Sequence, residues 1–101
     1  MEKCSFYSMM EKNHNEVAVL HDGYTDGAFY YYKSGAWWAA IEPKTGRSVS
    51  FERSRKMAAD VANSSQKLKA LDEFKATAKY KEYCSQLEKA WKLAEFGLME
   101  A

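Results

Sequence analysis

Hydrophobic and polar positions form their clearest pattern between Ala28 and Glu52, in the stretch AFYYYKSGAWWAAIEPKTGRSVSFE. Its aromatic residues favour a pleated, half-buried surface, and two turn signals divide it. Ser34-Gly35 supplies a two-residue hairpin loop, because glycine adopts the positive φ of tight turns, and residues 43–46 supply a Pro/Gly turn. The pattern predicts three antiparallel strands over residues 29–33, 36–41 and 47–52.

These turns also predict a register, with Tyr31 and Phe51 each opposite Trp38. Because side chains alternate between the faces of a strand, the register divides them into two sets. The first set is apolar and is predicted to form the core: Phe29, Tyr31, Trp38, Ala40, Val49 and Phe51. The second set mixes aromatic rings with serines and is predicted to face solvent: Tyr30, Tyr32, Trp37, Ala39, Ile41, Ser48, Ser50 and Glu52.

The N-terminal part of the chain has a weaker pattern. Residues 1–15 are predicted to be a loosely ordered polar lead-in. Residues 16–22, EVAVLHD, have strand character and would add a fourth strand, paired with 28–33 through the turn residues 23–27. The register of this strand stays open, because a tight turn at Asp26-Gly27 and a bulge at Gly23 orient its side chains oppositely.

The C-terminal half has helical periodicity. A first helix begins near Arg55 with Ser54 as N-cap, and a kink or break is expected at 63–65. A second helix runs from about 77 to 96, with Gly97 following it. Its apolar residues recur on one seam: Tyr80, Cys84, Leu87, Trp91, Ala94 and Leu98. The predicted fold is α+β, a single domain over 1–101: a meander of three or four strands over 16–52, then two helices over 54–98 packed on one sheet face.

Charge is distributed unevenly along a chain whose net charge is only +1. Residues 53–81 carry eight basic and three acidic side chains, a net charge of +5, whereas the segments on either side are each at −2. A charge run on helices is usually a solvated face. The total charge gives no general attraction toward nucleic acid or membranes.

Metal, cofactor and catalytic signatures are missing from the sequence. Cys4, His14, His21 and Cys84 match no zinc spacing, and neither nucleotide-binding glycine motif occurs. We therefore predict no metal, no cofactor and no enzymatic activity. Two cysteines make no disulfide framework, and neither a membrane-length apolar run nor a signal peptide is present. These features predict a cytoplasmic protein with reduced thiols that does not bind membranes.

The face predicted to stay open is the candidate binding site. Exposed tyrosine and tryptophan are typical interface anchors, so the face predicts a docking platform for a protein partner. Equally, its rings could pack under the N-terminal segment or against another copy of the protein. Its proposed residues are Tyr30, Tyr32, Lys33, Trp37, Arg47, Ser48 and Ser50. The alternative is nucleic-acid binding by this face together with the basic block, beginning with Arg53, Arg55 and Lys56. A homodimer through the helix over 77–98 is a third possibility.

One family resemblance covers residues 28–62. The run from Gly35 to Gly46, GAWWAAIEPKTG, followed by Phe51, Ser54 and the helix residues AADVA at 58–62, resembles the three-stranded-sheet-plus-helix domain of plant ethylene-response factors and of integrase arm-binding domains. The resemblance implies a sheet whose open face enters the DNA major groove, and an accessory protein of a phage or mobile element. The family's sheet uses several arginines, whereas this face offers Arg47 and Lys33 at strand ends.

Overall fold

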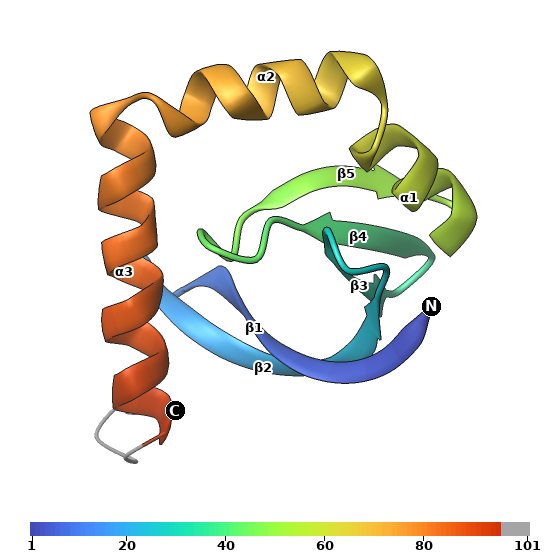
Figure 1. The fold of residues 1–101 in the computed structure, drawn as a ribbon. Coiled ribbons are helices and arrows are strands. Elements are labelled where there is room, and N and C mark those ends of the chain that lie inside the picture. The colour runs from blue at the N-terminus through green and yellow to red at the C-terminus, as the bar shows by residue number, and fades with distance from the viewer. Residues whose placement is uncertain (96–101) are drawn as a thin grey trace.

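A computed structural model of the chain describes residues 1–95. Within these residues, a five-stranded antiparallel meander in the order β1-β2-β3-β4-β5 is followed by three helices, which gives an α+β fold (Figure 1). The strands are β1 (Glu2–Lys12), β2 (Asn15–Thr25), β3 (Tyr30–Ser34), β4 (Trp37–Ile41) and β5 (Ser48–Glu52). The helices are α1 (Arg55–Ala62), α2 (Ser65–Lys75) and α3 (Ala78–Glu95).

The sheet bends so strongly that the β1–β2 hairpin lies across β3 to β5 (Figure 1). Phe6 of β1 is buried against Ala39 and Ile41 of β4 on the inside of this bend. Following the register from strand to strand defines two faces. The concave face carries Phe6, His21, Tyr32, Ala39 and Phe51, and the convex face carries Tyr7, Ala18, Tyr31, Ala40 and Trp38.

The helices that contact the sheet do so on the convex face. Ala58 and Ala62 of α1 are buried with Phe29, Tyr31 and Ala40. Leu87 and Ala90 of α3 are buried with Ala18 of β2, and Tyr7 and Met9 pack against them. Helix α2 has no buried residue and connects α1 to α3 across the top of the molecule in Figure 1.

The helix predictions hold in most respects. The Ser54 side chain accepts a hydrogen bond from the amide of Met57, as expected of an N-cap. The first predicted helix is broken at Asn63-Ser64, and the Ser64 hydroxyl caps α2 by accepting from the amide of Lys67. The second predicted helix is α3. Its predicted end at Gly97 and the place of Leu98 in its seam lie outside the described residues.

The prediction of a loose lead-in over residues 1–15 is wrong, because residues 2–12 form β1. Asn13 and His14, with φ of 52° and 66°, make the two-residue loop between β1 and β2. Both loop residues of such a hairpin need a positive φ, which asparagine adopts more readily than most residues. The predicted strand over 16–22 is therefore the middle of β2, and its long partner is β1.

The predicted registers of β3, β4 and β5 are also corrected. The first hairpin loop is Gly35-Ala36, so that Tyr31 lies opposite Ala40 and Ser34 opposite Trp37. This shift of two residues leaves the predicted faces of β3 and β4 unchanged. Between β4 and β5 a bulge at Val49 shifts the pairing by one residue. Phe51 consequently lies opposite Ala39 on the concave face, not with Trp38 in a shared core.

The bend is possible because β2 has glycine where it leaves β3. A Cβ atom on Gly23 would lie 2.1 Å from the carbonyl oxygen of Tyr31 and 2.9 Å from the Phe6 ring. Contact this close between two backbones excludes every residue that has a side chain. Gly23 thus allows the β1–β2 hairpin to cross β3 and bring Phe6 over the concave face.

The other end of the bend is closed by the turn between β4 and β5. The buried Glu42 carboxylate accepts hydrogen bonds from the amides of Lys44 and Thr45, which orders the turn internally. The carbonyl of Gly46 then accepts a 2.8 Å hydrogen bond from the amide of Met9 in β1. Gly46 has a φ of +68°, and a Cβ there would lie 2.9 Å from Leu87 of α3. The turn therefore joins β1, β5 and α3 at one place.

Asp26 holds the connection between β2 and β3 against α1. One carboxylate oxygen accepts from the amides of Ala28 and Phe29, and the other from the Tyr31 hydroxyl at 2.6 Å and the Asn63 amide at 2.9 Å. Burial alone would raise the pKa of Asp26, but these hydrogen bonds outweigh it and lower the pKa. The loop is thereby ordered at the hinge of the bend.

We expect Gly23→Ala to destabilise the fold by about 3 kcal/mol or more, because the new methyl group meets a backbone oxygen that cannot move without breaking the β2–β3 contact. The matched control is Gly35→Ala. Gly35, unlike Gly23, has a positive φ, of 61°, but nothing lies within 4 Å of its Cβ position. Its expected cost is about 1 kcal/mol of backbone strain. Urea unfolding of both variants would measure the difference, and equal losses would contradict this role of Gly23.

Candidate binding site

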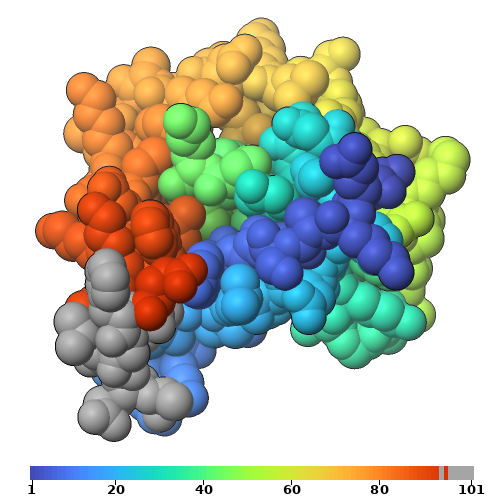
Figure 2. Space-filling view, turned by 60° about the horizontal axis from the view of Figure 1, so that its bottom comes forward, coloured from blue at the N-terminus to red at the C-terminus, as the bar shows by residue number. Residues whose placement is uncertain are grey.

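The concave face is open at the tip of the β3–β4 hairpin. Ser34, Trp37 and Phe51 line a cleft of about 380 Å³ there. Trp37 is 43% exposed and Phe51 is 54% exposed. Ser34 lies directly opposite Trp37, and Phe51 lies opposite Ala39, two residues along β4. In Figure 2 the hairpin tip projects at the lower right of the molecule.

A cation lies at the rim of this cleft. The guanidinium carbon of Arg53 is 4.6 Å from the ring centroid of Trp37, a cation–π distance. Glu52 is the single acidic residue among the described strands β3, β4 and β5, and it lies opposite Trp38 on the convex face. The cleft therefore combines two apolar rings with one positive charge and no nearby carboxylate from its own strands.

The covered end of the concave face is a stack of aromatic rings. Phe6 stacks on Tyr30 with ring centroids 4.7 Å apart, and His21 stacks on Tyr32 at 3.9 Å. The predicted site residues Tyr30 and Tyr32 are thus half-buried beneath the β1–β2 hairpin. The prediction of a fully open face is wrong at this end and correct at Trp37.

Ser8 and His21 form a pair that resembles a nucleophile and its base. The Ser8 hydroxyl and His21 Nε2 are 2.7 Å apart. Ser8 is only 1% exposed, however, and the neighbouring Asp22 bonds to Ser5 on the convex face and so cannot orient the imidazole. A substrate has no access to the hydroxyl, and the pair joins a buried serine to a half-buried histidine inside the bend.

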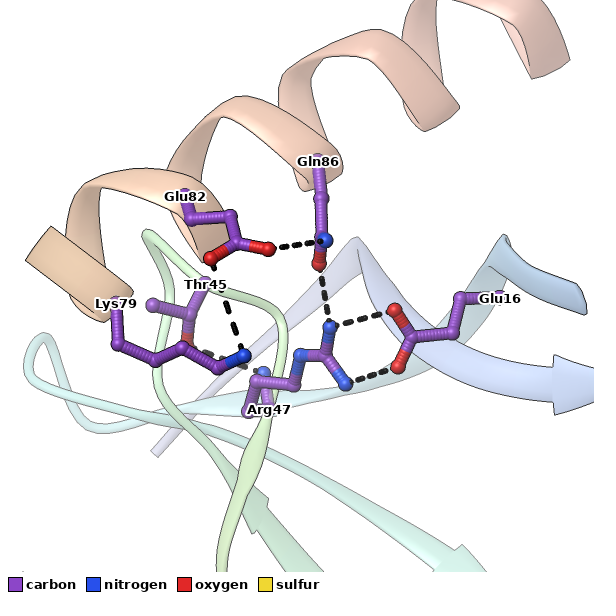
Figure 3. Close-up of polar contacts among 6 residues, drawn as sticks. All are labelled: Glu16, Thr45, Arg47, Lys79, Glu82 and Gln86. Carbon is purple, nitrogen blue, oxygen red and sulfur yellow. Dashed lines mark hydrogen bonds and ion pairs between the residues drawn. The ribbon is translucent and has the colours of Figure 1, made fainter.

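Arg47, also predicted as a binding residue, instead joins three elements (Figure 3). Its guanidinium makes a two-pronged ion pair with Glu16 of β2, donates to Gln86 of α3 at 2.8 Å and lies 4.1 Å from the Tyr83 ring centroid. The hydrogen bond from Arg47 is the main reason that the pKa of Glu16 is lowered. Arg47 therefore holds the hairpin and α3 around the β4–β5 turn, away from the cleft.

The remaining predicted residues are dispersed. Ser50 is buried on the convex face and donates to the carbonyl of Ala58, and Ser48 is exposed opposite Ile41. Lys33 is exposed but lies opposite Trp38 and so projects from the convex face. Of the predicted protein-binding residues, only Trp37 lines the cleft.

The residues of the nucleic-acid alternative also separate. Arg53 lies over Trp37, but Arg55 lies over Tyr24 on the convex face, at 4.1 Å from its ring centroid. Lys56 forms an exposed ion pair with Asp60 one helical turn later. The basic block thus does not gather beside the cleft at its N-terminal end.

Sequence reasoning missed two of the three cleft residues. Regular alternation along residues 47–52 predicts that Phe51 faces the core, because it does not include the bulge at Val49. Ser34 was missed because the predicted hairpin loop was Ser34-Gly35. A possible signal is the position of Phe51 at the polar end of its strand, directly before Glu52, Arg53 and Ser54. No part of the pattern locates the bulge itself.

Helix α3 uses part of its apolar seam within the monomer. Leu87 and Ala90 are buried against the hairpin, and the Trp91 ring lies 6.5 Å from that of Tyr7. Trp91 and Leu93 retain exposure. A homodimer through this helix stays a prediction.

The cysteines are free, and the described residues include no cluster of three metal-ligating side chains. None of the helices over residues 55–95 is long and apolar enough to cross a bilayer.

Comparisons of the chain with protein-family models, with curated proteins and with solved structures find no match. The resemblance over residues 28–62 therefore stays a prediction. The structure has its order of three strands and a helix, but Phe6 covers the middle of the sheet face that would enter a DNA groove.

We expect stability to fall between pH 7.5 and 5.5 because of His21. Burial lowers the pKa of His21 in the folded chain below the 6.5 of an unfolded histidine. The unfolded state therefore takes up the proton first, and the contribution of the neutral ring, complete above about pH 6.5, is lost as the pH falls toward the folded pKa. Urea midpoints at the two pH values measure this loss.

The control is His21→Gln, which can still hydrogen-bond Ser8 but does not titrate. We expect this variant to lose less stability over the same pH interval. An equal loss in both proteins would assign the pH dependence to other groups.

Proposed function

We propose that the chain is a non-catalytic binding module that docks a protein partner through the cleft of Ser34, Trp37 and Phe51. The observation that carries the proposal is that two large aromatic side chains are exposed side by side on a face whose middle is buried by its own hairpin. Tryptophan and other aromatic residues dominate the binding energy of protein interfaces when a partner desolvates them.

The cleft fits a side chain better than it fits a nucleic-acid strand. Its volume is about 380 Å³, and two of the three residues that line it are aromatic, whereas the third contributes a single hydroxyl. Nucleic-acid affinity depends on several cations following the phosphates. Only Arg53 is placed at the rim, whereas Arg55 and Arg47 stack on tyrosines elsewhere. A protein segment with an apolar anchor is therefore the favoured ligand.

The proposal predicts that Trp37→Ser and Phe51→Ser lose binding without unfolding, because both side chains are partly exposed. Peptides selected from a phage-displayed library of random linear sequences against the wild-type protein provide the probe. Each variant should weaken their binding by at least about tenfold, the usual effect of removing an interface anchor. Fluorescence anisotropy with labelled peptide measures the affinity, and circular dichroism checks the fold.

The matched control is Leu68→Ser, which removes an exposed apolar side chain from α2, outside the cleft. It should bind as the wild type does. Peptides that bind equally well to all four proteins would reject the cleft as the docking site. Labelled single-stranded and duplex oligonucleotides form a second arm. Oligonucleotide binding that requires Trp37 and Arg53 and falls steeply with salt would favour the nucleic-acid alternative.

A further inference from the structure

Strand β2 has a long edge with no strand beside it. Its 11 residues pair with β1 along their whole length, but only Tyr24 and Thr25 pair with β3. From Gly23 back toward Glu16, the bend separates β2 from β3. Among residues 1–95, no backbone hydrogen bond outside the β1–β2 ladder involves residues 16–22 of β2.

The hydrogen-bond pattern shows which backbone groups point outward on this edge. The amide of Met9 donates to Gly46, so it points away from β2. Met9 lies opposite Ala18, which makes the two residues a non-hydrogen-bonded pair of the antiparallel ladder. The N–H and C=O groups of Ala18 therefore point away from β1, and by alternation so do those of Leu20 and Asp22. Tyr24, next in the alternation, is the residue that pairs with β3.

Beyond Ala18, which Leu87 and Ala90 of α3 cover, the edge carries none of the features that usually protect an edge strand. The run from Val17 to His21, VAVLH, has no charge, no proline and two β-branched residues. Leu20 is 57% exposed, more than any other large apolar side chain of the described residues. At the far end of the sheet, by contrast, β5 has five residues and a bulge. An unprotected edge of this kind is a template for an added strand.

The free edge leads toward the cleft on the concave face. His21 of β2 stacks on Tyr32 of β3, Tyr32 lies opposite Ala39, and Ala39 lies opposite Phe51. The edge and the cleft thus border the same face of the sheet, with the buried Ala39 between them. Because β2 separates from β3, an extended chain can pair with β2 there without displacing an existing strand.

From these observations we infer that the partner docks as an extended segment that adds to the edge of β2 between Val19 and Asp22. The inference rests on the proposed function, in which a side chain of the same partner fills the cleft. The segment would place an apolar residue beside Leu20 and a basic residue beside Asp22. The Asp22 carboxylate is exposed, bonds to Ser5 and has no ion-pair partner among the described residues.

A second copy of this chain fits the edge less well than a different protein. If two β2 strands paired antiparallel around Val19, Glu16 would lie opposite Asp22 at both ends. Like charges directly opposite each other destabilise a strand pair. In the monomer Glu16 is already neutralised by Arg47, which leaves Asp22 as the charge that a partner strand would complement.

The decisive variant is Leu20→Pro. Proline removes the outward N–H that an added strand requires but leaves the β1–β2 ladder, which does not use this N–H. The matched control is Leu20→Thr, which also shortens the side chain but keeps the N–H and the strand propensity. With the library-selected peptides as probe, we expect Leu20→Pro to weaken binding by at least about tenfold and Leu20→Thr to weaken it much less. Circular dichroism and urea unfolding verify that both variants fold.

Hydrogen exchange gives a second readout that does not depend on a variant. Binding of the selected peptide should protect the amides of Leu20 and Asp22. Equal binding to Leu20→Pro and Leu20→Thr, without protection of these amides, would overturn the added strand. If Leu20→Pro does not fold, the amide protection alone tests whether the peptide adds as a strand to β2.

The outcomes separate this inference from the proposed function. Peptides that require Trp37 and Phe51 but not the Leu20 amide would keep the cleft and reject the added strand. Peptides that require the Leu20 amide but neither ring would keep the strand and reject the cleft. A selection that yields no binding peptide, or a dimer of the free protein that Leu20→Pro dissociates, would overturn the assignment of this edge to a partner protein.

Discussion

The contact between the backbones of Gly23 and Tyr31 determines the shape of this protein. Because nothing larger than a hydrogen atom fits there, β2 can pass directly over β3 and take the whole β1–β2 hairpin to the concave side. Phe6 then covers Ala39 and Ile41, and the amide of Met9 reaches the carbonyl of Gly46. The chain thereby encloses two sides of one short sheet. One side is covered by helices, and the other is covered by the chain's own first hairpin.

Much of the fold follows from local sequence, whereas the site does not. The turn chemistry of Gly35 and Pro43 to Gly46, the cap at Ser54 and the periodicity of α3 are local signals, and they locate β3, β4, β5, α1 and α3 correctly. The first strand was missed because Asn13-His14 lacks the glycine that usually marks a hairpin loop. Where β2 leaves β3 depends on contacts between residues far apart in the chain, which periodicity does not report.

The error at Phe51 shows how one residue changes a functional assignment. A strand register that slips by one position moves every following side chain to the opposite face. The bulge at Val49 does this between Ser48 and Ser50, so Ser50 enters the convex core and Phe51 faces the cleft. The predicted β3–β4 loop was displaced by one residue, which shifts the pairing by two and has no such effect, because an even shift preserves the faces. Trp37 was therefore placed correctly despite a wrong register.

The bend affects both the cleft and the free edge. A flat meander would extend the pairing of β2 with β3 as far as Ser34, opposite His21, and residues 16–20 of β2 would still have no strand beside them because β3 has only five residues. Bending at Gly23 exchanges that pairing for the burial of Phe6, which leaves the outward groups of Asp22 without a strand partner, like those of Leu20, and leaves Trp37 and Phe51 beyond the cover of the hairpin. The register with β1 places the side chains of Val17 and Val19 on the concave face. Charges at these positions would protect the edge but would disrupt the bend, so the sequence that stabilises this fold also keeps the edge able to accept a strand.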